Sequence, residues 1–118
     1  MDYIRLKNIR IFARHGCLDE EKLLGAEFLI NVQMGLDLST AGRSGNIEDT
    51  VNYAEVYALI RKEMRRPEKL LEKAAYRIAR KIMDRFPAIR EIRFDLAKLH
   101  PPLPGQTEQS EISIFLQR

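Results

Sequence analysis

Lys98 is the residue of this chain whose position most clearly suggests chemistry. It continues the apolar alternation of Ile92, Phe94 and Leu96, so its side chain leaves a strand on the buried side. A lysine partly removed from water loses its proton more easily, which suits a general base or an amine nucleophile. The alternative is a strand-end lysine with a buried stem and an ammonium group that reaches water.

Three further polar residues could act beside such a lysine. Glu72 lies at the predicted start of a helix, where the helix dipole stabilises a carboxylate. A carboxylate fixed there can hold a planar, amidine-like edge through two parallel hydrogen bonds. Glu21 belongs to an acidic loop, and Tyr53 follows a predicted helix cap, where its phenol could pack or donate a proton. Each of these residues also has a simple structural explanation, so only their combination indicates a functional site.

The composition is that of one globular domain covering residues 1–118. The chain is 45% hydrophobic and 31% charged, with a formal net charge of +3. No apolar run approaches the ~18 residues of a membrane helix, and the start lacks the layout of a signal peptide. No basic run is interleaved with aromatic residues, so we expect neither nucleic acid nor a membrane as a partner.

Cysteine and histidine are scarce. Cys17 is the single cysteine, which excludes an internal disulfide and favours a cytoplasmic location. Together with His15 and His100 it offers too few ligands for a structural zinc site, so no metal is expected. The chain also lacks a glycine-rich phosphate loop and a nucleophile elbow.

The hydrophobic pattern predicts that the chain begins with a β-hairpin. Apolar residues over 3–12 change parity near Lys7 and Asn8, which a β-bulge would explain. The second strand, over 28–38, shows the clearest alternation. We expect the two strands to pair across a loop at 15–25.

Two helices should follow a loop over 39–51. Asn52 is a predicted N-cap, and Glu55 stands where a capping box would place its acidic residue. This helix should end at 65–66, because a proline disfavours helical backbone in the residue before it. A second amphipathic helix is predicted over 68–85.

The remaining residues predict two more strands, around 92–98 and 111–116, separated by a stiff proline turn at 100–105. The ββααββ order favours an α+β fold: one four-stranded antiparallel sheet with both helices on one face. Long strands whose second face is partly apolar invite pairing between subunits, which indicates a homo-oligomer.

Several motifs together resemble the dihydroneopterin aldolases of folate synthesis, over nearly the whole chain and in the family's order. They are the octapeptide at 49–56, His15-Gly16 with Glu21 and Gly25, Leu70-Leu71-Glu72, and Lys98 with the proline turn. The resemblance implies the tunnelling fold, in which subunits form tetrameric sheet barrels, commonly stacked as octamers. It also implies that the active site lies between subunits.

The resemblance implies a role for each matching residue. The pterin substrate would be bound by Glu72, Leu71, Val51 and Tyr53. Lys98 and Glu21 would form the catalytic pair, with Tyr53 assisting proton transfer. Lys98 would take a hydroxyl proton through water, so that 7,8-dihydroneopterin breaks into 6-hydroxymethyl-7,8-dihydropterin and glycolaldehyde. The reduced pterin accepts the electrons itself, so neither a cofactor nor a metal is implied.

Two other functions stay open from the sequence. One is a 2′-epimerase for dihydroneopterin or its triphosphate on the same fold, for which Arg14 or Lys22 could bind phosphate. The other is a non-catalytic assembly subunit that uses its sheet edges. Departures from the family pattern at Ala26, Gln106 and 108–111 concern contacts with the substrate tail.

Overall fold

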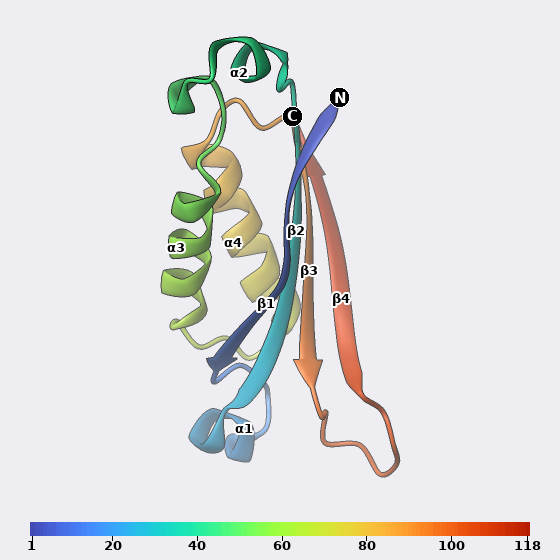
Figure 1. Cartoon of the computed structure of the whole chain (residues 1–118). Coiled ribbons are helices and arrows are strands. Elements are labelled where there is room, and N and C mark those ends of the chain that lie inside the picture. Colours follow the sequence, from blue (N-terminus) through green and yellow to red (C-terminus); the bar gives the residue numbers. More distant parts are fainter.

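One antiparallel sheet of four strands runs along the molecule (Figure 1). The computed structural model describes all 118 residues. The strands pair in chain order, so β1 and β4 form the two edges, which the sequence pattern had left undecided. The strands are β1 (Asp2–Ala13), β2 (Ala26–Leu36), β3 (Glu91–Leu99) and β4 (Gln109–Gln117). The α+β fold class predicted from the sequence is confirmed.

The predicted β-bulge is present in β1. The pairing register of β1 with β2 shifts between Leu6 and Ile9, and Asn8 there has a φ of 58°. The backbone N–H of Asn8 donates to Asn31 Oδ1 at 2.8 Å, which satisfies a donor that the bulge removes from the ladder. The shift explains why the apolar residues of β1 change parity along the strand.

β2 ends two residues earlier than predicted, at Leu36. The side-chain Oδ1 of Asp37 accepts a hydrogen bond from the Ser39 N–H at 2.8 Å, which turns the chain out of the strand. Apolar alternation continues to Leu38, but the turn overrides it.

The two long helices, α3 (Tyr53–Met64) and α4 (Leu71–Arg85), cover one face of the sheet, as predicted (Figure 1). The predicted start of the second helix at residue 68 is wrong by three residues. Both backbone groups of Glu68 bond elsewhere: its carbonyl accepts from the Gly16 N–H, and its N–H donates to the His15 ring. Glu68 therefore cannot enter the first turn of α4.

The N-cap predicted for α3 is confirmed, but the capping box is not. The Asn52 Oδ1 accepts from the Ala54 N–H at 3.0 Å. The Glu55 carboxylate does not return to the cap. It lies 3.8 Å from the guanidinium of Arg85 on α4, so it joins the two helices instead.

Two segments predicted as loops contain short helices. These are α1 (Asp19–Leu24), α2 (Ser39–Ser44) and a 3-10 turn, η1 (Ile47–Asp49). Segments of six residues or fewer are too short to show helical periodicity, so the pattern could not predict them. None of the helices combines the length and the apolar character that a membrane crossing requires.

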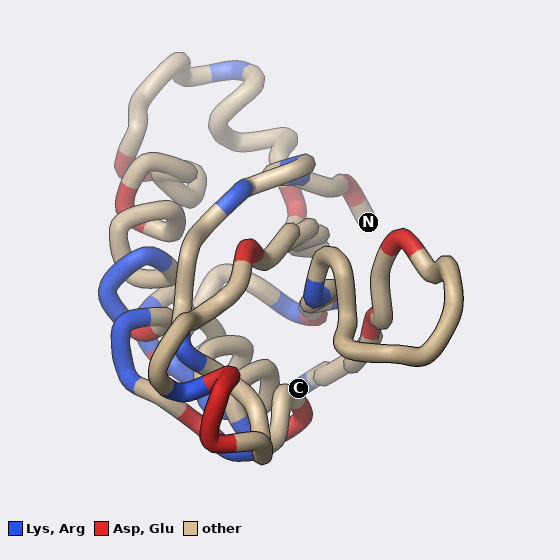
Figure 2. The backbone as a smooth tube through the Cα atoms, turned by 90° about the horizontal axis from the view of Figure 1, so that it is seen from below, with Lys and Arg blue, Asp and Glu red and all other residues tan.

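The core lies between the sheet and the two long helices. Cross-strand rows such as Leu6, Val32, Phe94 and Ile114 line the covered face. The buried side of α4 is contributed by Ala74, Ala75, Ile78, Ala79, Ile82 and Met83. Its three alanines let the helix approach the sheet closely, because small side chains leave little space between backbones. An end-on view shows that Lys and Arg gather mainly along the helices (Figure 2).

Candidate active site

Lys98 and Glu21 meet in a buried ion pair. Lys98 lies in β3 opposite Phe28 of β2, on the helix-covered face, as its parity predicted. Its Nζ contacts the Glu21 carboxylate, and the two side chains are only 8% and 14% exposed. The structure therefore brings together the two residues predicted to be the catalytic pair.

Two opposing effects act on the proton of Lys98. Burial lowers the pKa of the Lys98 ammonium group from its ordinary value, because the charged form loses its hydration, and the nearby Cys17 thiol raises that pKa. The carboxylate of Glu21 also favours the charged form. A buried amine whose pKa is lowered by burial and balanced by neighbouring groups is a suitable general base.

Glu21 is placed by the turn that precedes α1. Its carboxylate accepts a hydrogen bond from the Leu18 N–H at 3.2 Å and packs directly over Gly16. A Cβ at Gly16 would lie 2.5 Å from the Glu21 Cδ, and Gly16 has a φ of 145°. Only glycine fits there, because the backbone angle and the close carboxylate both exclude a side chain.

Two of the four residues predicted to bind the pterin, Glu72 and Leu71, lie in the same half of the molecule as this pair. α4 begins in the half that carries α1 and the end of β3 (Figure 1). Glu72 stands in the first turn of α4, and its exposed carboxylate makes no hydrogen bond or ion pair within the chain. Leu71 is half-buried beside it. No side chain caps this helix, so its first N–H groups and Glu72 stay available to a ligand.

Tyr53 and Val51 do not join the other site residues within one chain. α3 begins in the half of the molecule that carries α2 and runs toward the end that carries α1 (Figure 1), and Tyr53 is its first residue. A helix of 12 residues is roughly 18 Å long. Tyr53 is 63% exposed, whereas Val51 as a whole residue is only 3% exposed within the core.

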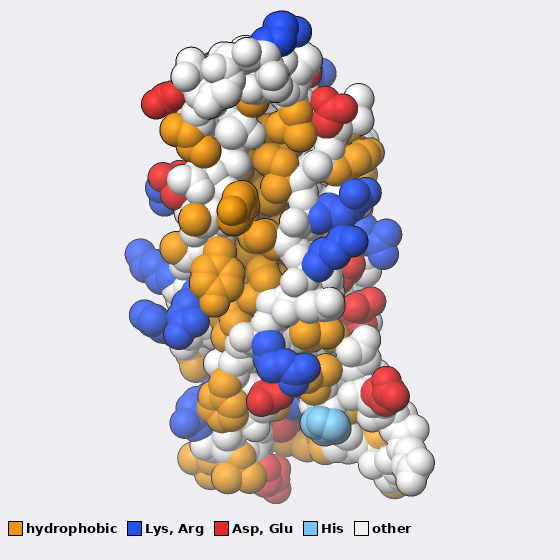
Figure 3. All heavy atoms as spheres, in the orientation of Figure 1, with side chains coloured by type: hydrophobic (Ala, Val, Ile, Leu, Met, Phe, Trp, Pro, Cys, Tyr) orange, Lys and Arg blue, Asp and Glu red, His pale blue; other side chains and the backbone are white.

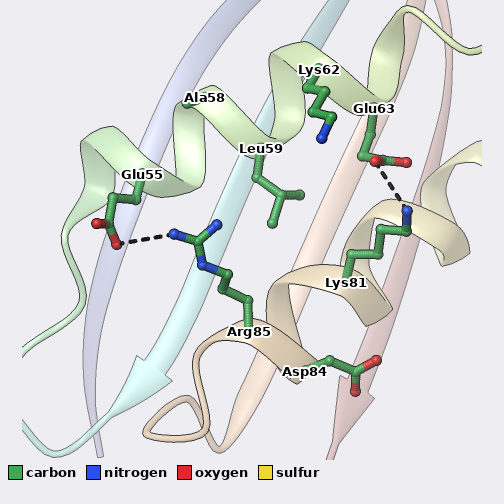
Figure 4. A pocket seen from close by; sticks show the side chains of 8 residues that line it. All are labelled: Glu55, Ala58, Leu59, Lys62, Glu63, Lys81, Asp84 and Arg85. Carbon is green, nitrogen blue, oxygen red and sulfur yellow. Dashed lines mark hydrogen bonds and ion pairs between the residues drawn. The ribbon is translucent and has the colours of Figure 1, made fainter.

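A cavity of about 570 Å³ between α3 and α4 contains none of the predicted site residues (Figure 4). It is lined by Glu55, Ala58, Leu59, Lys62, Glu63, Lys81, Asp84 and Arg85. Four of its charges pair across the helices, Glu63 with Lys81 at 3.1 Å and Glu55 with Arg85. It is a charged groove between helices, and neither Lys98 nor Glu21 lines it.

Sequence reasoning missed one component of the site region, the ion pairs of Arg77. This α4 residue, 13% exposed, binds the carboxylates of Glu63 and Glu68, which precede the helix. Its guanidinium also donates to the backbone carbonyls of Glu63 and Arg66. The only feature of the sequence that could have indicated these ion pairs was an arginine close to the apolar stripe of α4. No group of three His, Cys, Asp or Glu side chains has a metal-binding arrangement.

The chain has an α+β fold with a buried lysine–carboxylate pair of the kind that acid–base enzymes use. The family model for dihydroneopterin aldolase matches residues 4–115. The chain belongs to the dihydroneopterin aldolase family.

Curated relatives match over almost their full length. The dihydroneopterin aldolase of Staphylococcus epidermidis is 35% identical over 114 residues, covering 96% of this chain and 94% of the relative. The dihydroneopterin aldolase of Bacillus subtilis is 33% identical over 115 residues, covering 97% of this chain and 96% of the relative. The solved structure of E. coli dihydroneopterin aldolase in complex with neopterin superposes with a TM-score of 0.91 at 19% identity. That superposition covers 98% of this chain and 99% of the other, and at this identity it supports the fold alone.

Proposed function

We propose that this protein cleaves 7,8-dihydroneopterin by a retro-aldol reaction to 6-hydroxymethyl-7,8-dihydropterin and glycolaldehyde, in folate biosynthesis. The observation that carries the proposal is the buried contact of Lys98 with Glu21, in a chain that matches the dihydroneopterin aldolase family from residue 4 to 115. An acid–base pair removed from water is what a proton transfer from a weakly acidic hydroxyl requires.

The reaction needs one proton removed and one returned. Lys98, acting through a water molecule and oriented by Glu21, takes the proton of the 2′-hydroxyl. The bond between the first and second side-chain carbons breaks, and the second carbon becomes the aldehyde of glycolaldehyde. The electron pair moves into the C=N bond of the reduced pterin. Tyr53 then assists return of a proton to the first side-chain carbon, which restores the C=N bond and gives the hydroxymethyl product.

Binding of the pterin is assigned to the start of α4. The free carboxylate of Glu72 accepts two hydrogen bonds from the amino-pyrimidine edge, in the planar geometry that carboxylates favour. Leu71 lines the slot beside it, and Val51 contributes its backbone. The neopterin named with the E. coli structure supports a pterin as the ligand class.

We further propose a homo-oligomer, a tetramer or an octamer, in which a neighbouring subunit supplies Tyr53 and Val51. Support comes from the position of Tyr53 in the half of the molecule that carries α2, whereas Lys98 lies in the half that carries α1. The free edges of β1 and β4 offer backbone groups for pairing between copies. An apolar stripe also runs between α3 and β1 (Figure 3). Incompletely buried apolar residues of these elements are Ile4, Leu6, Ile11, Leu59 and Tyr57.

A 2′-epimerase acting on the triphosphate receives less support. The curated relatives described above are dihydroneopterin aldolases, and neither Arg14 nor Lys22 lies in an ion cluster built for phosphate. A cytoplasmic location is also proposed, on the basis of the single unpaired cysteine, Cys17.

Product analysis by mass spectrometry tests the proposed reaction. Purified protein incubated with 7,8-dihydroneopterin should release glycolaldehyde and 6-hydroxymethyl-7,8-dihydropterin. Lys98→Ala should reduce turnover by roughly 10²-fold or more, whereas Lys81→Ala, at an exposed lysine paired with Glu63, should not. No cleavage by the unaltered protein, or full turnover in Lys98→Ala, would reject the function.

A further inference from the structure

His15 joins the two segments that carry the catalytic pair and the pterin anchor. Its side chain is fully buried, and its Nδ1 accepts a hydrogen bond from the Glu68 N–H at 3.0 Å. The next residue, Gly16, donates its N–H to the Glu68 carbonyl at 2.9 Å. Both backbone groups of Glu68 are thus bound to consecutive residues that follow β1.

On one side of this link lies the catalytic carboxylate. Gly16 is in direct contact with the Glu21 side chain, and Glu21 contacts Lys98. A displacement of residues 15–16 would therefore move the surface on which the Glu21 carboxylate rests.

On the other side lies the start of α4. Glu68 precedes Leu71 and Glu72 by only a few residues, and its carboxylate is 10% exposed and bound to Arg77 on α4. Arg77 thereby fixes Glu68 to the helix, while His15 and Gly16 fix Glu68 to the loop after β1. The same residue thus sets the spacing between the catalytic pair and the pterin anchor.

The link requires one form of the imidazole ring. Nδ1 must be unprotonated to accept from Glu68, so the ring proton is on Nε2, which has no hydrogen-bond partner within the chain. The ring packs edge-on against Phe28 with 5.4 Å between ring centroids. The hydrogen bond accepted by Nδ1 is thus the single polar contact of the His15 side chain. A substitution that preserves the link must therefore keep a hydrogen-bond acceptor at this position.

We propose that His15 is a positioning residue: through Glu68 it holds the Glu21–Lys98 pair in register with Glu72, and so aligns the scissile side chain of a bound pterin with the base. The proposal rests on the proposed function for the identity of the substrate. Loss of this alignment should reduce turnover strongly, because a displacement of about 1 Å can reduce turnover roughly 10²-fold.

Two near-isosteric substitutions at His15 separate the acceptor from the bulk of the ring. His15→Asn places an amide oxygen near the position of Nδ1, whereas His15→Leu has a similar branched shape and no acceptor. His15→Leu should reduce kcat roughly tenfold or more, with a smaller effect on the dissociation constant of 6-hydroxymethyl-7,8-dihydropterin. His15→Asn should restore most of kcat. Equal losses in both variants, or wild-type kcat in folded His15→Leu, would overturn the proposal.

A second pair of variants tests the link without altering the buried ring. Glu68→Gln weakens the contact with Arg77 and should lower kcat, whereas Lys73→Gln removes an exposed lysine 4.0 Å from Glu68 and should not. If both variants behave alike, Glu68 is not the connecting residue.

Hydrogen exchange of the segment 65–70 gives a readout that does not depend on catalysis. The Glu68 amide should exchange faster in His15→Leu than in His15→Asn, because only the Leu variant lacks an acceptor for it. If the unaltered protein fails to cleave 7,8-dihydroneopterin, the proposed function fails while this exchange measurement still decides whether the link exists. Unchanged exchange in His15→Leu would show that it does not.

Discussion

The carboxylate of Glu21 contacts the ammonium group of Lys98, although one residue belongs to the short helix α1 and the other to the end of β3. Burial lowers the pKa of Lys98, and the carboxylate opposes that shift. Glu21 and Cys17 thus both favour the charged form of the proposed base, and the Glu21 carboxylate can be removed by substitution.

Glu21→Gln should move the acidic limb of the pH–rate profile to lower pH. The base acts only when Lys98 is neutral, so the rate rises as pH increases through the pKa of Lys98. Removing the carboxylate destabilises the ammonium form and lowers that pKa further, since burial is then opposed by Cys17 alone. The measurement is kcat against pH for both proteins. A limb displaced to higher pH would contradict the assignment of Lys98 as the base.

Glu72→Gln should weaken pterin binding with only a small effect on stability. An amide offers one acceptor where the carboxylate offers two, so the planar two-point contact is lost, and we expect roughly tenfold weaker binding or more. Glu72 is exposed and has no partner in the chain, so the unfolding transition should move only slightly, through the lost interaction with the helix dipole. Calorimetric titration with 6-hydroxymethyl-7,8-dihydropterin measures the effect. Glu20→Gln, at an exposed residue of α1, is the control, and equal affinity in both variants would exclude Glu72 as the anchor.

Gly16→Ala should reduce activity by displacing Glu21. A Cβ at this position meets the Glu21 carboxyl group at 2.5 to 2.7 Å, and the φ of 145° is unfavourable for alanine. Gly42→Ala is the matched control, because a Cβ there meets nothing within 4 Å. We expect at least a roughly tenfold fall in kcat for Gly16→Ala and unchanged kcat for Gly42→Ala. Comparable activity in both would mean that the close packing over Gly16 has no role in placing the carboxylate.

Residue patterns predicted the sheet and the two long helices, and the family resemblance implied the pairing of Lys98 with Glu21, but neither predicted how the site is supported. Strands and long helices repeat a hydrophobic pattern over many residues, so their positions could be predicted to within a few residues. The link from His15 to Glu68 involves a single ring nitrogen and a backbone amide far apart in the chain. Such a contact leaves no periodic signal, and it also shifted the start of α4 from its predicted position.

Acid should destabilise the protein through His15 in a pH range above that of the carboxylates. Burial lowers the pKa of His15, and the positive charges of Arg77 and Lys98 lower it further, while Glu68 opposes them. The folded protein therefore binds fewer protons than the unfolded chain once the pH falls below about 6.5, the ordinary value for histidine. Stability is fully present above that pH and declines as the pH falls toward the depressed pKa of folded His15.

Thermal unfolding between about pH 7 and pH 5 measures this loss, because most carboxylates titrate below that interval. The Tm of the unaltered protein should fall across the interval. His15→Asn cannot take up the proton, so its Tm should change much less, whatever its absolute value. The same slope in both proteins would show that the titration of His15 does not control acid stability, and that other groups carry the effect.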